Sequence, residues 1–254
     1  MLDKKVVFIA GACGRIGKAL SKACILNNAK IIITDIDEEK LYKLKKDLNN
    51  DENILCLKLN INDKEQIDYC LKQSVLKFDK IDAFINCAYP YGKDWGKVAY
   101  YEASYEKICE DLNLHLASFI FIACEFVKFF KKQGFGNIIN LSSIMGVYAP
   151  KFENYEGTSM QSPLEYSVIK AGINHLGVWL AKELFNTNIR VNSVAFGGIE
   201  DNQPQSFLKA YRKCCASKGM LDSDDICGTL IFLISDHSKY ITGQTIIVDD
   251  GWGL

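Results

Sequence analysis

Arginine is scarce in this sequence. Its 254 residues contain only Arg15, Arg190 and Arg212 among 30 basic residues, and the others are lysine. Arginine holds phosphates and carboxylates through paired hydrogen bonds, so recognition by arginine clusters is not expected. Any anionic ligand should instead be held by lysines or by backbone amides. The formal net charge of −1 also argues against nucleic-acid binding, which would require a basic surplus.

The sequence has no long apolar run, no leader pattern and no linker. The nearest apolar run, Leu112–Cys124, is interrupted by Asn113, His115 and Ser118, whereas a membrane span needs about 18 apolar residues. Residues Met1–Lys5 lead directly into a strand pattern and do not resemble a signal peptide. We therefore expect a soluble, cytoplasmic protein with no membrane partner. We expect a single domain over residues 1–254.

Cysteine is common but follows no pairing pattern. The ten cysteines are scattered without a C-x-x-C motif, and several lie in apolar segments, where a thiol behaves as a small hydrophobe. The three histidines, His115, His175 and His237, have no acidic residue at ligand spacing on a shared helix face. The sequence therefore predicts reduced cysteines and no metal site.

Short β-branched apolar segments alternate with longer amphipathic ones. The predicted strands are Lys5–Ala10, Ile31–Asp35, Ile54–Asn60, Ala83–Asn86, Asn137–Ser142, Arg190–Ala195 and Thr245–Val248. The predicted helices are Arg15–Asn28, Glu38–Asn49, Lys64–Leu76, Glu102–Lys132, Glu165–Phe185, Ser206–Ser217 and Ser223–Ser235. This alternation predicts an α/β fold with a seven-stranded parallel sheet and helices on both faces.

Irregular segments follow three of the predicted strands. They are Tyr89–Tyr101, Gly146–Pro163 and Gly197–Gln205, after the fourth, fifth and sixth strands. The carboxyl ends of parallel strands meet at one edge of the sheet, where open α/β folds bind their ligands. We therefore expect these three segments to form a binding site together.

Three glycines lie at the first junction between a strand and a helix. Gly11, Gly14 and Gly17 follow an apolar strand and precede a helical pattern. Glycine lets the backbone approach a pyrophosphate, and the free amides of a helix N-terminus favour negative charge. The junction predicts a dinucleotide-binding fold of the Rossmann type.

The second predicted strand ends in Asp35. A carboxylate at this place accepts hydrogen bonds from the adenosine ribose and repels a 2′-phosphate. Asp37 adds a second acid, whereas Arg15 is a residue that could pair with a 2′-phosphate. The sequence therefore favours NAD over NADP.

A tyrosine four residues before a lysine on a helix is a plausible base for oxidising an alcohol. Lowering the tyrosine pKa from about 10 to about 7 requires roughly 4 kcal/mol, which a cation about 4 Å away supplies at an effective dielectric near 20. About one such pair is expected by chance, but three occur: Tyr42/Lys46, Tyr89/Lys93 and Tyr166/Lys170. Tyr89/Lys93 contains Pro90 and Gly92, and Tyr42/Lys46 lies in the second helix. Tyr166/Lys170 opens a helix at the ligand edge, so position favours it.

With these features in place, the whole chain resembles the classical short-chain dehydrogenase/reductase family. The matching segments are Gly11–Gly17, 86–88, Asn113, 137–143, 166–172, 189–195 and 241–244. The resemblance implies that Tyr166 is the general acid/base and that Lys170 lowers its pKa and binds the nicotinamide ribose. Ser143 would orient the substrate oxygen, and Asn113 would hold a water in a proton relay. Asn86 would stabilise the sheet near the cofactor.

The resemblance also implies a set of cofactor contacts. They are Gly11, Cys13, Gly14, Arg15, Ile16, Gly17, Asp35, Asn60, Ile61, Asn86, Ala88, Lys170, Gly197 and Ile199. Several positions depart from the family pattern. Asn60 replaces the usual adenine-side aspartate, Tyr89 replaces a glycine and Phe196 replaces a proline. The glycine spacing resembles the extended branch of the family, but the chain is too short for that branch's substrate domain.

The stretch between Ser143 and Tyr166 is longer than usual in the family. With the segment after the fourth strand it supplies the predicted substrate contacts, Tyr91, Lys93, Trp95, Lys151 and Tyr155. Aromatic and charged side chains suit a sugar-like polyol, including a phosphorylated one, better than a steroid or acyl chain. The chain further resembles bacterial oxidoreductases of surface-glycan and flagellin-modification sugar synthesis.

Two other functions stay open at this stage. One is an NADP-dependent 3-oxoacyl or lipid ketone reductase, and the other is a non-catalytic dinucleotide-binding regulator on the same fold.

Two helical patterns are apolar nearly all round, over Leu112–Val127 and Ile169–Leu184. Helices of this kind pack against a partner as well as a sheet. The sequence therefore predicts a dimer or tetramer.

Overall fold

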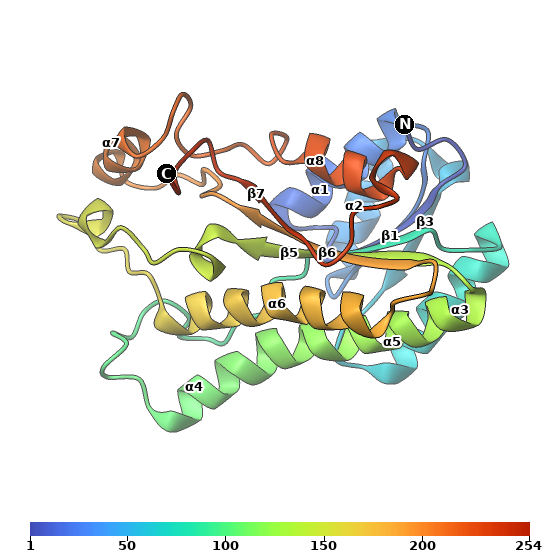
Figure 1. Cartoon of the computed structure of the whole chain (residues 1–254), viewed down its shortest axis with the longest axis horizontal. Helices are drawn as coiled ribbons and strands as arrows, with labels where there is room; N and C mark the ends of the chain where they lie inside the picture. The colour runs from blue at the N-terminus through green and yellow to red at the C-terminus, as the bar shows by residue number, and fades with distance from the viewer.

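The computed structural model describes residues 1–254 and has the predicted α/β architecture (Figure 1). Its strands are β1 (Val6–Ala10), β2 (Lys30–Asp35), β3 (Ile54–Lys58), β4 (Ala83–Asn86), β5 (Gly136–Ser143), β6 (Ile189–Phe196) and β7 (Thr245–Val248). Its α-helices are α1 (Arg15–Leu26), α2 (Glu38–Leu48), α3 (Lys64–Phe78), α4 (Tyr105–Asp111), α5 (Ser118–Gln133), α6 (Leu164–Glu183), α7 (Gln205–Lys213) and α8 (Cys227–Ile234). Each predicted strand and helix is present, although α7 ends earlier and α8 begins later than predicted.

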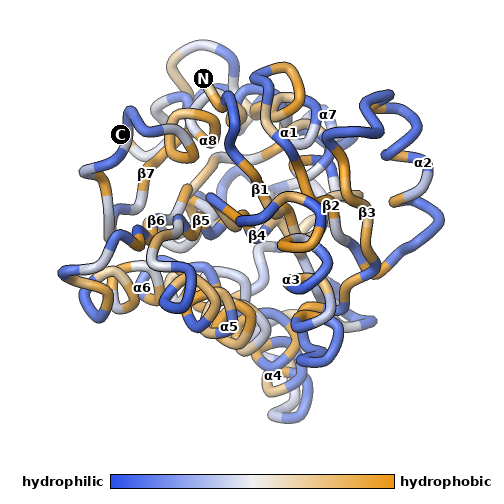
Figure 2. The backbone as a smooth tube through the Cα atoms, turned by 90° about the vertical axis from the view of Figure 1, so that its right-hand side faces the viewer, coloured by the Kyte–Doolittle hydropathy of each residue, from blue (hydrophilic) through white to orange (hydrophobic).

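All seven strands form one parallel sheet. Their order is β3-β2-β1-β4-β5-β6-β7, and every neighbouring pair is parallel. Figure 2 shows the strands in this order across the molecule, with α1, α2 and α8 on one side and α3, α5 and α6 on the other. The strand order reverses between β1 and β4. That reversal leaves a crevice at the carboxyl edge of the sheet, where α/β folds bind ligands.

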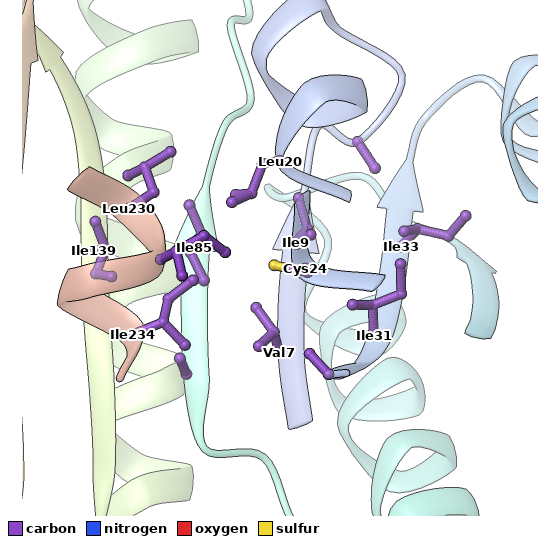
Figure 3. Packing of buried hydrophobic residues seen from close by; sticks show 14 of the residues in the cluster. Val7, Ile9, Leu20, Cys24, Ile31, Ile33, Ile85, Ile139, Leu230 and Ile234 are labelled. Atoms are coloured by element: carbon purple, nitrogen blue, oxygen red, sulfur yellow. The ribbon is translucent and has the colours of Figure 1, made fainter. Parts of the chain in front are cut away.

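Two apolar layers bury the faces of the sheet. Alternate residues of a strand point to opposite faces, so Val7 and Ile9 lie in one layer and Phe8 lies in the other. In the first layer, strand side chains pack against Leu20 and Cys24 of α1 and against α8 (Figure 3). In the second layer the rings of Phe84 and Phe126 are stacked, with centroids 3.7 Å apart. Burial on both faces explains why the strands read as continuous apolar runs.

Side chains cap the N-termini of several helices. Asp37 accepts a hydrogen bond from the Lys40 amide at 3.0 Å, and Asp63 accepts one from the Gln66 amide at 3.1 Å. These bonds satisfy amides that the helix itself leaves free. By contrast, Gly14 begins α1 without a side-chain cap and without an acidic residue in the first turn. The first amides of α1 therefore remain open at the ligand edge.

The long helix predicted over Glu102–Lys132 is interrupted near its middle. A π-helical turn at Leu112–Ala117 joins α4 to α5, and helical structure runs from Tyr105 to Gln133. By length and composition this stretch could cross a membrane. Its Phe119, Phe126 and Phe130 side chains, however, are fully buried within the fold. The apolar character is accordingly that of a core helix.

Candidate active site

The turn between β1 and α1 is built closely around its glycines. Gly11 has a left-handed φ of +72°, and a Cβ there would lie 2.6 Å from the Ala88 backbone. A Cβ on Gly17 would lie 2.7 Å from the Ala12 Cα, so Gly17 keeps α1 close to the turn without lining a cavity. Gly14 presents the open amides of α1. This cradle fits a pyrophosphate, because amides and the helix dipole both favour an anion.

Asp35 lies beside this turn in a fixed orientation. Its carboxylate accepts hydrogen bonds from the amide of Cys13 at 2.9 Å and from the amide of Asp37 at 3.2 Å. Asp35 lines a cavity of about 370 Å³ with predicted cofactor residues Gly11, Cys13, Gly14, Asn60, Ile61 and Ala88. Burial, reinforced by Asp35, raises the pKa of the Cys13 thiol to about 12, so the thiol stays protonated and unreactive.

Arg15 does not line the cavity around Asp35. Its guanidinium forms an ion pair with Asp201 in the segment after β6 and donates a hydrogen bond to the Glu200 carbonyl at 3.4 Å. Arg15 is therefore engaged on the other side of the turn. It lines a second cavity, of about 760 Å³, together with predicted cofactor residues Ile16, Gly197 and Ile199.

Asn86 is buried below the turn and lines neither cavity. Its side-chain oxygen accepts a hydrogen bond from the Ala88 amide at 3.2 Å, while its side-chain nitrogen has no partner. The bond fixes the chain just after β4, next to Gly11. Asn86 therefore supports the turn, whereas its position does not support the direct cofactor contact that is also predicted for it.

Ser143, Tyr166 and Lys170 meet at the floor of the larger cavity. Ser143 ends β5, whereas Tyr166 and Lys170 lie one turn apart near the start of α6. The hydroxyl group of Ser143 lies close enough to that of Tyr166 to lower its pKa. The Lys170 ammonium donates to the Leu141 carbonyl at 3.2 Å and lies 5.6 Å from the centre of the Tyr166 ring. A substrate oxygen in the cavity can therefore meet two hydroxyl groups above one cation.

Burial governs the pKa values of this cluster. It lowers the pKa of Lys170 to about 7, because a buried ammonium loses its hydration. It raises the pKa of Tyr166, and the hydrogen bond from Ser143 only partly opposes that rise. The sequence predicts a lowered tyrosine pKa, whereas the structure places the main shift on the lysine.

The structure places the Asn113 side chain outside this cluster. It lies on the exposed side of the π-helical turn, so its position does not support the predicted role in holding a water. His115, two residues later, is fully buried, and its Nε2 atom lies 3.4 Å from the Lys170 Nζ atom. Residues two apart on a helix face different directions, so only one of these two polar side chains can point inward.

Aromatic side chains form the walls of the larger cavity. Three of the predicted substrate residues, Tyr91, Trp95 and Tyr155, line it. Further residues that were not predicted from the sequence also line this cavity, namely Tyr89, Met145, Met160, Phe207, Tyr211 and Met220. Tyr89 is central among them: its hydroxyl accepts a hydrogen bond from the Trp95 indole at 3.1 Å, and its ring centre lies 6.1 Å from that of Tyr166. The sequence did carry a signal for Tyr89, because this tyrosine replaces the glycine that is usual in the family.

The two predicted substrate lysines lie outside the cavity. Lys151 donates a hydrogen bond to the Trp252 carbonyl at 2.8 Å, and its ammonium lies 4.7 Å from the Trp252 ring centre. It therefore anchors the C-terminal segment. Lys93 is exposed and lines neither cavity. The prediction that these lysines hold an anionic substrate is not supported by their positions.

The chain is similar to known proteins along its whole length. The family model described as Enoyl-(Acyl carrier protein) reductase matches residues 11–253. Post-translational flagellin modification protein A of Campylobacter coli is 66% identical over 256 residues, covering 100% of both chains. A 3-oxoacyl-(acyl-carrier-protein) reductase of Thermotoga maritima is 31% identical over 255 residues, covering 98% of each chain.

Solved structures share the whole fold. A short-chain dehydrogenase from Leptospira borgpetersenii with bound NAD+ superimposes with a TM-score of 0.87 at 26% identity, covering 100% of this chain and 94% of that one. A 3-ketoacyl-(acyl-carrier-protein) reductase from Brucella melitensis complexed with NADH gives a TM-score of 0.82 at 21% identity, with 100% of both chains covered. The second likeness concerns the fold alone.

Proposed function

The chain belongs to the short-chain dehydrogenase/reductase family, an oxidoreductase family acting with NAD(P), and we propose from this premise that it interconverts a secondary hydroxyl and a ketone on a sugar-like substrate with NAD. One observation carries the proposal. Ser143, Tyr166 and Lys170 meet at the floor of a cavity of about 760 Å³ with aromatic walls.

The chemistry follows from these three residues. The nicotinamide, when bound, accepts or donates the hydride. Ser143 and Tyr166 orient the substrate oxygen through their hydroxyl groups, and Tyr166 takes the hydroxyl proton in oxidation or returns it in reduction. The Lys170 ammonium stabilises the tyrosinate electrostatically. The tyrosinate is therefore favoured while Lys170 keeps its charge, and burial opposes the charged form of both side chains.

The walls of the cavity favour a neutral, polyhydroxylated substrate. Aromatic rings present flat apolar faces to the C–H faces of a sugar, and tyrosine hydroxyls can bind its hydroxyl groups. Arg15 and Asp201, which also line the cavity, already neutralise each other. Because Lys93 and Lys151 lie outside the cavity, no unpaired surface cation is available there to bind a phosphate near the reacting carbon. Any phosphate or nucleotide would extend away from this end.

The name of the Campylobacter coli relative supports a place in surface-glycan synthesis. That protein is called a post-translational flagellin modification protein, and 66% identity over the full chain supports a related substrate. We accordingly assign the proposed reaction to sugar biosynthesis for a bacterial glycan. The two core layers span the entire sheet and support one domain over residues 1–254. We place the enzyme in the cytoplasm as part of the same proposal.

Asp35 and Arg15 support NAD over NADP. Asp35 is held in the orientation that a ribose diol requires, and a 2′-phosphate beside it would meet like charge. Arg15 is paired with Asp201 and lies outside that cavity. A fluorescence titration should give tighter binding of NADH than of NADPH, and Asp35→Ser should reduce the difference at least tenfold. Tighter binding of NADPH by the unaltered protein would refute the cofactor assignment.

Helix α6 offers the surface for self-association. Its exposed face carries Leu164, Val168, Val178 and Trp179, with Phe185 just beyond its end. An apolar face of this kind costs solvation energy unless a partner covers it. A second copy of the chain is the partner we propose, giving a dimer or tetramer.

The reaction is tested by a substrate panel. Keto sugars, sugar phosphates, nucleotide sugars, a 3-oxoacyl thioester and a steroid ketone are incubated with NADH or NADPH, and absorbance at about 340 nm is followed. The proposal expects turnover of a sugar with NADH, and loss of that turnover in Tyr166→Phe with retained NADH binding. Turnover of only the thioester with NADPH would identify a lipid ketone reductase. No turnover at all, with cofactor binding intact, would identify a regulator.

A further inference from the structure

His115 occupies an unusual place at the base of the site. Its side chain is fully buried at the π-helical turn, and its Nε2 atom lies 3.4 Å from the Lys170 Nζ atom. The ring of Tyr89 lies edge-on to it with centres 5.0 Å apart, and the ring of Phe119 lies 5.4 Å away. His115 is thus the polar side chain that this helical stretch turns towards the lysine.

The charge state of His115 follows from its surroundings. Burial, with a smaller effect of the Lys170 charge, lowers the pKa of His115 to about 2, so the ring is neutral at any working pH. A neutral imidazole has one donor nitrogen and one acceptor nitrogen. An ammonium can only donate, so the Nε2 atom must accept and the Nδ1 atom must carry the hydrogen. The Nδ1 atom is buried and has no hydrogen-bond partner within the protein.

The Lys170 ammonium depends on few acceptors. The Leu141 carbonyl accepts at 3.2 Å, and His115 is the other polar partner. The rings of Tyr89, Phe119 and Tyr166 surround the ammonium at 5.4–5.6 Å from their centres. Burial alone accounts for the altered pKa of Lys170, and no carboxylate contributes.

The charges nearby on the same helical stretch balance each other. Asp111, one turn before His115, is paired with Lys107 at 2.7 Å. The other titratable groups that face His115 and Lys170 are Tyr89, from the segment after β4, and Tyr166, from α6. Neither tyrosine can replace His115 as an acceptor for the ammonium without approaching it much more closely than these ring distances.

We propose that His115 is a positioning residue, which accepts a hydrogen bond from the Lys170 ammonium and keeps that charge beneath Tyr166. The inference rests on the proposed function, because it assigns a support for the acid/base pair. Without the acceptor, the charged lysine is less stable, and the tyrosinate that depends on it is less stable too. Oxidation of the substrate alcohol then requires a higher pH.

Three variants separate this role from simple packing. His115→Leu removes the acceptor and keeps a comparable volume, whereas His115→Gln keeps an acceptor that can reach Lys170. Asn113→Ala changes the exposed neighbour. A hydrogen bond to a charged group is worth about tenfold to a hundredfold in an equilibrium constant. In alcohol oxidation, His115→Leu should move the acidic limb of the kcat profile upward by about one pH unit, with NADH affinity changed less than threefold.

The matched variants complete the test. His115→Gln should restore the acidic limb to within about 0.3 pH unit of the unaltered protein, and Asn113→Ala should not move it. An unshifted limb in folded His115→Leu protein would refute the proposal. So would an equal loss of kcat in the Leu and Gln variants with no change of pH dependence, because that result indicates packing alone.

A spectroscopic measurement removes the dependence on folding of the variants. In the unaltered protein with ¹⁵N-labelled histidine, His115 should be neutral and protonated at Nδ1 from about pH 5 to pH 9. Protonation at Nε2, or titration within that range, would overturn the inference while leaving the proposed reaction intact. Failure of the unaltered enzyme to turn over any hydroxyl or ketone substrate would overturn the proposed function instead.

Discussion

Replacing the buried lysine by methionine should stabilise the protein at neutral pH and abolish turnover. Lys170 is only 3% exposed, and burial lowers its pKa from the ordinary 10.5 to about 7. Keeping the ammonium in this place therefore costs about 5 kcal/mol, and about 4 kcal/mol at pH 7, where half of the lysines are neutral. Methionine has no charge to desolvate and a similar length.

The loss of two hydrogen bonds offsets part of the stabilisation expected from Lys170→Met. The variant leaves the Leu141 carbonyl and the His115 Nε2 atom without the donor that each has in the native protein. Two such losses cost about 2 kcal/mol together. The expected net stabilisation at pH 7 is therefore about 2 kcal/mol, which corresponds to roughly 4–8 °C in Tm for a chain of this size.

The stability difference between Lys170→Met and the native protein depends on pH. Between pH 7 and 10.5 the unfolded chain still binds a proton that the folded Lys170 has released, so native stability rises with pH across this window. The free-energy cost of the buried Lys170 charge is fully present below pH 7 and absent above pH 10.5. The advantage of Lys170→Met should accordingly be largest at pH 7 or below, shrink by about 1.4 kcal/mol per pH unit, and reverse before pH 10.

Urea unfolding at pH 6, 7, 8, 9 and 10 measures this difference directly. Lys182→Met, an exposed lysine of the same helix, is the control and should give a difference that does not change with pH. A Lys170→Met protein that is less stable than the native one at pH 7, with a difference constant from pH 7 to pH 10, would refute the reasoning. That result would mean that the lysine is fully compensated in the folded state.

Three further substitutions test other parts of the structure. Gly17→Ala places a Cβ 2.7 Å from the Ala12 Cα and should weaken NADH binding at least tenfold by fluorescence, whereas Gly228→Ala, with nothing within 4 Å, should not. Lys151→Met loses the bond to the Trp252 carbonyl and should cost about 2 kcal/mol in urea unfolding with KM unchanged; a raised KM alone would return the residue to the substrate site. Trp179→Asp, at a side chain 59% exposed, should lower the mass measured by light scattering to that of a monomer, and an unchanged mass would exclude α6 as the interface.

The sheet and the cofactor turn are predictable because their signals are local. The continuous apolar strands and the glycines after β1 each lie within a few residues of the feature they specify. Asp35 follows in the same way from the end of β2. The Tyr166–Lys170 pair needed one more step, its position at the ligand edge, because spacing alone also matched Tyr42/Lys46.

The inward side chain of the π-helical turn was not predictable in this way. A regular helix offers several registers, and Asn113 and His115 are both polar in an apolar stretch. Only the packed structure shows which of them faces Lys170. The substrate-binding role predicted for Lys93 and Lys151 was not supported, for a related reason. Lys151 binds a carbonyl near the C-terminus, 101 residues away, and nothing in its own segment indicates that partner.

The scarcity of arginine has a clear structural consequence. Arg15 pairs with Asp201, Arg190 donates to the Ile241 and Leu233 carbonyls at 3.0 and 2.9 Å, and Arg212 donates to the Lys218 carbonyl at 2.6 Å. All three are thus used within the protein. The remaining source of positive charge at the reacting end is Lys170, whose own charge is weakened by burial. An anionic group at that end would compete with the tyrosinate for this one cation, so the fold favours substrates that react through a neutral hydroxyl or ketone and carry any charge elsewhere.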